Sequence, residues 1–188
     1  MNLDLSINNL WVFYALAYVI AYSMQVWSYK KRGAPVDDPE FLIHGKHGKK
    51  LVAIAATWIA SGFVISLFVR VNSGILLYAG ILVSIVGLIL GGFAAYSYAN
   101  KSGLVTKGFL KYSRNPMYVV WTIILLGLTI IGWSGSIWSI LFAIYLIVTL
   151  FYFYWTTTLE EEFLTEKYGD SYRKYLKKTP RYLGLPRR

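Results

Sequence analysis

The sequence has 188 residues, of which 56% are hydrophobic and only 15% charged, against about 25% charged in an average soluble domain, so its surplus apolar surface requires lipid to cover it. It contains no cysteine, which excludes disulfides, thiolate catalysis and cysteine-ligated metal sites. The net charge is +10, and the basic residues that produce it lie in the gaps between apolar runs. This distribution favours anionic lipid headgroups over nucleic acid as the partner.

Long runs without charge predict five transmembrane helices, because about 20 apolar residues cross the hydrocarbon core of a bilayer. The first three runs cover residues 7–29, 51–69 and 75–98. No charged residue lies between Pro116 and Glu160, a stretch too long for one helix, and the Gly-Trp-Ser-Gly sequence at 132–135 divides it. These features predict a helical hairpin, with a short helix over 117–132 and a longer one over 136–157.

The basic residues predict the orientation of the chain. Of the 19 Lys and Arg residues, six lie in 30–50, four in 99–116 and eight from 158 onward. Only Arg70 remains for the other side, so the positive-inside rule places these three segments in the cytoplasm and the N-terminus outside. We therefore expect one all-α, polytopic domain over 1–188 in the cell inner membrane: three spans in 1–98, a cytoplasmic loop at 99–116, the hairpin at 117–157 and a cytoplasmic tail at 158–188.

Two stripes of residues predict how the helices pack. The third span carries small residues at helical spacing: Gly80, Ser84, Gly87 and Gly91. Small residues at this spacing let two membrane helices approach closely. The tail carries a larger apolar and aromatic stripe at similar spacing: Leu164, Tyr168, Tyr172 and Tyr175. This stripe predicts an amphipathic helix that lies on the membrane or on the cytoplasmic loops.

A metal site is not expected. His44 and His47 form an H-x-x-H pair in a loop rich in Gly and Lys. A metal ion would need a third protein ligand, and only distant carboxylates could supply it.

Two cytoplasmic segments carry the polar groups from which a functional site could be built. Residues 103–118 contain two glycines, Arg114 and a proline at the start of a helix, and backbone N–H groups at such a junction can hold a carboxylate. Residues 159–168 contain three consecutive carboxylates, which can pair with Arg114 or with a ligand ammonium. Each segment also has a structural explanation, because the carboxylates can complement the helix dipole and Arg114 can be a positive-inside anchor.

Four motifs run in order over about residues 100–182. They are Leu104-Val105-Thr106-Lys107-Gly108, Arg114-Asn115-Pro116-Met117-Tyr118, Glu160-Glu161, and Tyr168-Gly169-Asp170-Ser171-Tyr172-Arg173-Lys174-Tyr175. The predicted hairpin separates the second motif from the third. In order and spacing, these motifs resemble those of the isoprenylcysteine carboxyl methyltransferase and phospholipid methyltransferase superfamily of membrane enzymes. The first spans resemble that superfamily only in being apolar membrane helices and carry none of these motifs.

The resemblance implies an S-adenosylmethionine-dependent methyltransferase that acts on a lipophilic substrate by in-line displacement at a sulfonium methyl group. The residues implied to bind the cofactor are Ser102, Gly103, Leu104, Val105, Gly108, Leu110, Asn115, Pro116, Met117, Tyr118 and Glu160. The implied catalytic residues are Glu160, Glu161 and Arg114. Glu160 would face the cofactor ammonium, and Arg114 would pair either with the cofactor carboxylate or with Glu161.

Three positions depart from the superfamily pattern. Asn115 stands where His is most common, and Leu110 stands where Tyr is usual. Thr156, four residues before Glu160, occupies the position of an Arg that serves the substrate carboxylate in the carboxyl methyltransferases, so we expect it on the substrate side. Without that cation, a membrane lipid such as a phospholipid amine, or another lipidated small molecule, fits better than a prenylcysteine. Glu160 or Glu161 would attract the ammonium or remove its proton.

Three other functions stay open from the sequence. They are an isoprenylcysteine carboxyl methyltransferase, a sterol-reductase-like membrane oxidoreductase with a similar C-terminal hairpin, and a non-catalytic membrane protein. The chain is short for a reductase and has no obvious additional basic site for a 2′-phosphate. The departures at Leu110 and Asn115 leave room for a non-catalytic protein.

Overall fold

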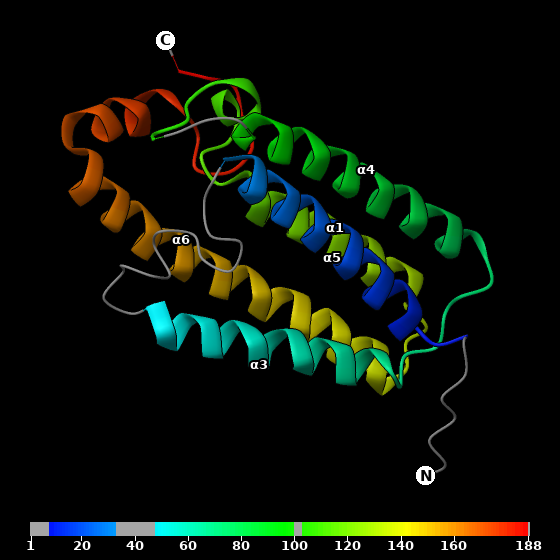
Figure 1. Ribbon diagram of the computed structural model, residues 1–188. Helices are drawn as coiled ribbons and strands as arrows, with labels where there is room; N and C mark the ends of the chain where they lie inside the picture. The colour runs from blue at the N-terminus through cyan, green and yellow to red at the C-terminus, as the bar shows by residue number, and fades with distance from the viewer. Residues whose placement is uncertain (1–7, 33–47, 100–102, 188) are drawn as a thin grey trace.

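The computed structural model describes residues 8–32, 48–99 and 103–187, which form one helical bundle (Figure 1). In chain order the elements are α1 (Trp11–Arg32), α3 (Gly48–Ser66), α4 (Ile75–Tyr98), a 3₁₀ helix η1 (Gly108–Lys111), α5 (Pro116–Ile131) and α6 (Ile137–Lys178). Within these ranges no strand forms, and the extended pairing is one isolated bridge between Asn9 and Arg70. The prediction of an all-α fold is confirmed.

The helices fall close to the predicted runs. The third run has the bounds of α4, and the Gly-Trp-Ser-Gly sequence separates α5 from α6 as predicted. By contrast, α3 begins and ends three residues earlier than predicted, because a long side chain such as that of Lys50 can belong to a membrane helix while its charge extends towards water. The chain after α3 leaves the helix because it pairs with the segment before α1. The N–H of Leu10 donates to the carbonyl of Val69, and the N–H of Val71 donates to the carbonyl of Asn8.

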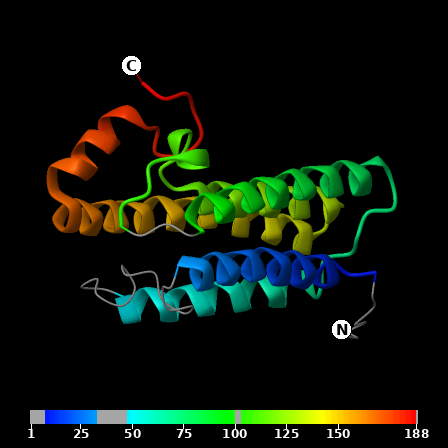
Figure 2. The ribbon, with the colours of Figure 1, turned by 45° about the horizontal axis from the view of Figure 1, so that its top comes forward.

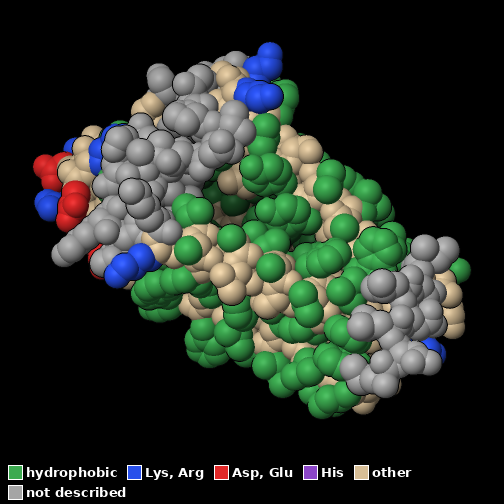
Figure 3. All heavy atoms as spheres, turned by 60° about the horizontal axis from the view of Figure 1, so that its bottom comes forward, with side chains coloured by type: hydrophobic (Ala, Val, Ile, Leu, Met, Phe, Trp, Pro, Cys, Tyr) green, Lys and Arg blue, Asp and Glu red, His purple; other side chains and the backbone are tan. Residues whose placement is uncertain are grey.

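The surface of the bundle is suited to lipid. Figure 3 shows hydrophobic side chains covering the middle of one face, with acidic and most basic side chains towards one end. Ile75 is 82% exposed and Phe151 is 71% exposed, and such apolar surface favours a hydrocarbon surrounding over water. Two helices in the described part of the chain, α4 and α6, are long and apolar enough to cross a membrane, whereas α5 has 16 residues. The count of five spans and the cytoplasmic orientation stay predictions.

The predicted small-residue stripe is the contact between α4 and α5. A Cβ at Gly80 would lie 2.5 Å from the carbonyl oxygen of Gly127, and one at Gly87 would lie 2.8 Å from the Ile124 side chain. A Cβ at Gly127 would collide with the hydroxyl of Ser84. The two backbones are therefore in close contact along their length, as expected for small residues at a membrane helix interface.

The core lies where α1, α5 and α6 meet. Its buried residues, which come from these helices, from the residue before α1 and from the segment between α3 and α4, are Leu10, Tyr14, Ala17, Ala21, Val69, Val120, Ile124, Leu125, Leu128, Ile131, Phe142 and Tyr145. On the remaining side, α3 runs beside α1 (Figure 2) and contacts α6. The nitrogen of Trp58 in α3 donates to the Thr149 hydroxyl in α6 at 3.0 Å, which satisfies a polar group inside the bundle.

The last helix does not end with the hairpin but continues into the tail. A kink at Gly169, where φ is 53° and ψ is −129°, turns the final segment across the end of the bundle (Figure 1). Only glycine adopts this conformation without strain. Beyond the kink, Tyr172 and Tyr175 pack against Val105 and Leu110 of the loop after α4. The predicted amphipathic stripe therefore lies on the loop between α4 and α5.

Candidate active site

The carboxylate of Glu161 is surrounded by donors at the junction of loop, hairpin and tail. Its Oε1 accepts from Arg114 Nε at 3.1 Å, from Arg114 Nη2 at 2.9 Å and from Asn115 Nδ2 at 3.1 Å. Its Oε2 accepts from Arg181 Nε at 3.1 Å and from Arg181 Nη2 at 2.6 Å. The side chains of Glu161 and Arg114 are about nine-tenths buried, so solvent screens this pair weakly.

Arg114 and Asn115 are placed by the start of α5. Pro116 occupies the first turn of that helix, where its missing N–H is not needed. Asn115 stands at the N-cap, yet it makes no side-chain cap, because its amide donates to Glu161 and to the carbonyl of Arg181. Asn is an effective capping residue elsewhere, so its use here connects the hairpin to the tail at the expense of the cap.

The chain after α6 passes over this junction as a strap, residues 179–187. The other Arg114 nitrogen, Nη1, donates to the carbonyls of Leu176 at 2.8 Å and Thr179 at 2.5 Å. The backbone N–H of Arg114 donates to Pro180, and Gly184 donates to Tyr112. Arg114 therefore binds the tail with its backbone and its side chain while it neutralises Glu161.

Glu160 has different surroundings from its neighbour. Its Oε2 accepts from the hydroxyl of Tyr118 at 3.1 Å, and no arginine contacts it in the described structure. Burial of the carboxyl raises its pKa from 4.5 to about 7; the Tyr118 hydrogen bond lowers the pKa, and the nearby negative charge of Glu161 raises it further. Glu160 is thus a carboxyl group that can gain or lose a proton near neutral pH.

Two further features of the junction suit a polar ligand. Glu161 carries one negative charge against the two guanidinium groups of Arg114 and Arg181, so the cluster has a surplus positive charge. The hydroxyl of Thr157 is fully buried and has no hydrogen-bond partner among the described residues. Thr157 lies one turn before Glu161 on the same face of α6. A buried hydroxyl without a partner costs free energy, so it is a natural contact for a ligand atom.

A comparison with known families decides what this junction belongs to. The family model described as phospholipid methyltransferase matches residues 69–171, more than half of the chain. The chain belongs to the phospholipid methyltransferase family. No match was found among curated proteins or among solved structures.

Membership of the phospholipid methyltransferase family agrees with the predicted resemblance, and the matched region contains both Arg114 and the Glu160–Glu161 pair. The sequence left two partners open for Arg114, and the structure pairs it with Glu161. Two other predicted residues contact the glutamates: Asn115 donates a hydrogen bond to Glu161, and Tyr118 donates one to Glu160.

Other predicted site residues lie in different surroundings. Val105 and Leu110 are buried beneath the tail helix with Leu104 packed against them, and the Leu110 carbonyl accepts from Tyr175. Gly108 faces Ser97 with a φ of +69°. The hydroxyl of Thr156 is buried and donates to the carbonyl of Tyr152. The positions of Ser102, His44 and His47 lie outside the described residues.

Sequence reasoning missed Arg181 and Thr157. Arg181 was counted only as one of the basic residues of the tail, and it lies beyond the region that the family model matches. The available signal was the run of three acidic residues at 160–162, which one cation, Arg114, cannot neutralise alone. Thr157 gives no sequence signal, because the orphaned state of its hydroxyl depends on packing.

Proposed function

We propose that this protein is an S-adenosylmethionine-dependent methyltransferase whose methyl acceptor is the amine of a membrane phospholipid, at the cytoplasmic face of the cell inner membrane. Family membership supports methyl transfer. One observation carries the rest: among the described residues, Glu160 accepts a side-chain hydrogen bond from Tyr118 alone, whereas Glu161 is neutralised by two arginines. Glu160 is therefore the carboxyl group that is available to a ligand cation, and Glu161 is a positioning residue.

The residues present fit S-adenosylmethionine. The amino-acid part of this cofactor carries a carboxylate, for which the junction offers the positive charge of Arg114, while Glu160 is left to the amine of the acceptor. The Thr157 hydroxyl supplies one more polar contact. The start of α5 adds backbone N–H groups that no side chain caps.

When bound, S-adenosylmethionine supplies a methyl group on a sulfonium. The protein's task is to align a nucleophile with it, because proximity and orientation provide most of the acceleration in such a displacement. A phospholipid ammonium must first lose a proton, and the second oxygen of Glu160, Oε1, can accept it while Tyr118 holds Oε2. The pKa of about 7 suits a group that takes up and releases a proton at neutral pH.

Methyl transfer can be tested with purified protein in nanodiscs that contain phosphatidylethanolamine. We expect S-adenosylmethionine with a labelled methyl group to bind and to label the lipid amine, and prenylcysteine to be a poor acceptor. Glu160→Gln should lower transfer by about 100-fold or more, the usual scale for loss of general acid–base catalysis. Glu162→Gln removes the same charge from an exposed neighbour and should retain activity. Folded wild-type protein that neither binds the cofactor nor labels lipid would overturn the proposal.

A further inference from the structure

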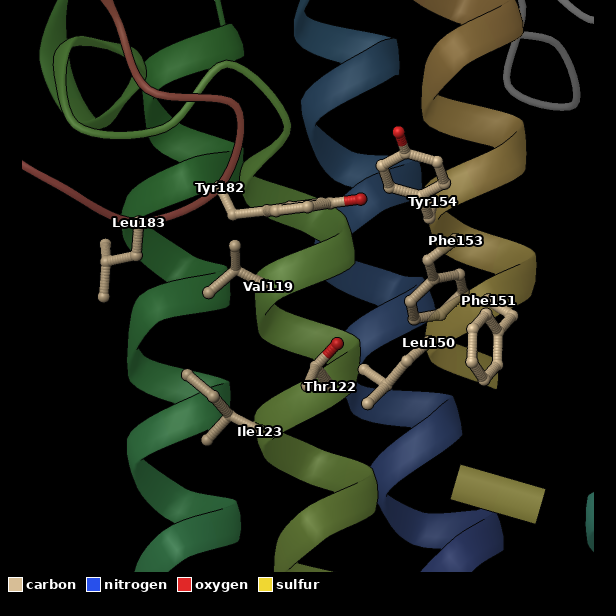
Figure 4. Close-up of a pocket in the computed structure, with 9 residues that line it drawn as sticks. All are labelled: Val119, Thr122, Ile123, Leu150, Phe151, Phe153, Tyr154, Tyr182 and Leu183. Carbon is tan, nitrogen blue, oxygen red and sulfur yellow. The ribbon is translucent and has the colours of Figure 1, made fainter. Parts of the chain in front are cut away.

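An apolar groove lies beside the candidate active site. It has a volume of about 630 Å³ and opens between α5 and α6 beneath the strap (Figure 4). Its walls are Val119, Thr122 and Ile123 from α5, Leu150, Phe151, Phe153 and Tyr154 from α6, and Tyr182 and Leu183 from the strap. The one non-aromatic hydroxyl in this lining, on Thr122, donates to the carbonyl of Tyr118. The groove therefore offers mainly apolar surface.

The groove faces the surroundings of the bundle. Phe151 is 71% exposed and Tyr154 is 58% exposed, and none of the lining residues is fully buried. In Figure 4, Tyr182 extends across the upper end of the groove towards Tyr154, so the strap covers that end, while Leu150 and Phe151 below it are exposed. A membrane lipid could enter sideways without passing through water.

The roofed end of the groove reaches both charged groups of the site. The ring of Phe153 lies 5.1 Å from the ring of Tyr118, centre to centre, and Tyr118 donates to Glu160. The guanidinium of Arg181, from the strap, lies 5.2 Å from the centre of the ring of Tyr154, which is on α6 like Phe153. The apolar groove thus adjoins a guanidinium on one side and, through Tyr118, a carboxyl group on the other. A phospholipid amine carries three matching groups: an acyl chain, a phosphate and an ammonium.

The size and charge of the groove favour this occupant over another protein helix. Its α6 wall covers residues 150–154, about 6 Å of helix rise, which is about one turn and too short a face for packing a partner helix. One flexible hydrocarbon chain can use such a short groove. The surplus positive charge of the Arg114–Glu161–Arg181 cluster complements a phosphate.

We propose that this groove binds an acyl chain of the phospholipid acceptor, with the lipid phosphate beside Arg181, so that the lipid enters laterally between α5 and α6. This inference rests on the proposed function. It identifies the groove residues as those that select an acceptor anchored in the membrane.

A photoreactive lipid tests the groove without any need for methyl transfer. Protein in phosphatidylcholine nanodiscs would be given phosphatidylethanolamine with a diazirine in one acyl chain, and the crosslinked residues would be mapped by mass spectrometry. We expect crosslinks at Ile123, Leu150 and Phe151 to exceed those at lipid-exposed residues of α4 such as Leu82. Leu150→Trp should fill the groove and lower these crosslinks at least about fivefold. The matched variant Ile147→Trp lies one turn away, 53% exposed and outside the groove, and should not change them.

The outcomes separate this inference from the proposed function. If crosslinks were spread over the surface in proportion to exposure, or if the two tryptophan variants crosslinked equally, acyl-chain binding in the groove would be overturned. This holds even if the wild-type protein methylates the lipid. Crosslinks concentrated in the groove of a folded protein that transfers no methyl group would support lipid binding there and would count against the proposed reaction. Diazirine-labelled diacylglycerol, which lacks the phosphate, should crosslink less; equal crosslinking would overturn the role given to Arg181.

Discussion

Arg181 and Glu161 are joined by two hydrogen bonds, of 3.1 and 2.6 Å, across twenty residues of sequence. Because Arg114 contacts the other oxygen of the same carboxylate, Glu161 connects the start of α5 to the strap that follows α6. The adjacent glutamates therefore have different surroundings. Glu161 joins two segments of the junction, whereas Glu160 accepts from the Tyr118 hydroxyl and pairs with no arginine in the described structure.

Glu161→Gln should destabilise the protein strongly. The substitution leaves two guanidinium groups, one of them about nine-tenths buried, without a counter-charge, and breaking a buried pair in this way costs about 3–5 kcal/mol. Thermal unfolding in detergent measures the effect. Glu162→Gln, at an exposed position, is the control and should change the midpoint little. Equal midpoints for the two variants would contradict the structural role of Glu161.

Arg181→Ala should release the strap. Limited digestion with trypsin would then cut faster after Lys177 and Lys178, because the backbone that follows them loses a side-chain anchor. Arg173→Ala is a suitable control, since Arg173 pairs with Asp170 where both side chains are at least 66% exposed, and such pairs contribute little. Unchanged cleavage in Arg181→Ala would show that the other strap contacts suffice.

The raised pKa of Glu160 predicts a dependence of stability on pH. The folded state holds this proton up to about pH 7, whereas the unfolded chain releases it near pH 4.5. The stabilisation is therefore fully present below pH 4.5 and is lost as the pH rises through about 7. Allowing for the partial exposure of Glu160, we expect the free energy of unfolding of the wild type to fall by about 1–2 kcal/mol relative to that of Glu160→Gln between pH 5 and 8. Thermal unfolding of both proteins from pH 5 to 8 measures the difference, and parallel curves would refute it.

Gly127→Ala should disrupt the packing of α4 against α5. The new methyl group would meet the Ser84 hydroxyl and lie 2.7 Å from the Gly80 carbonyl, and overpacking of this kind costs about 1–3 kcal/mol. Gly92→Ala in α4 has no neighbouring atom within 4 Å of the added Cβ and should be neutral or stabilising by up to about 1 kcal/mol. The two unfolding midpoints should therefore move in different directions, and a similar loss in both would point to a general intolerance of alanine.

The helices could be predicted because their boundaries depend on local features. The bounds of α4 follow from a charge-free run, and the hairpin follows from two glycines that interrupt another. The start of α3 was misplaced because charge alone does not show how far a lysine side chain extends. Continuation of α6 beyond the hairpin was missed because the acidic residues after position 159 suggested an end of the membrane helix, although an α-helix can continue into water.

The candidate site could be predicted only in part. Its two main segments were recognisable because Arg114, Pro116 and the glutamates lie in compact motifs. The difference in hydrogen-bond partners between Glu160 and Glu161 could not be predicted, because it depends on Arg181. Arg181 reaches the site only after the kink at Gly169 turns the tail back over the loop. Contacts created by such a change of direction have no periodicity or fixed spacing to reveal them.

The shortness of α5 has a consequence for the membrane itself. Its 16 residues rise about 24 Å, against about 36 Å for the 24 residues of α4 and about 30 Å for a typical hydrocarbon layer. For α5 as the predicted span, this hydrophobic mismatch favours a locally thinned bilayer where the helix meets lipid. Under the proposed function, thinning would bring the headgroups down to Tyr118 at the start of α5, so that bilayer thickness would control how often an amine reaches Glu160.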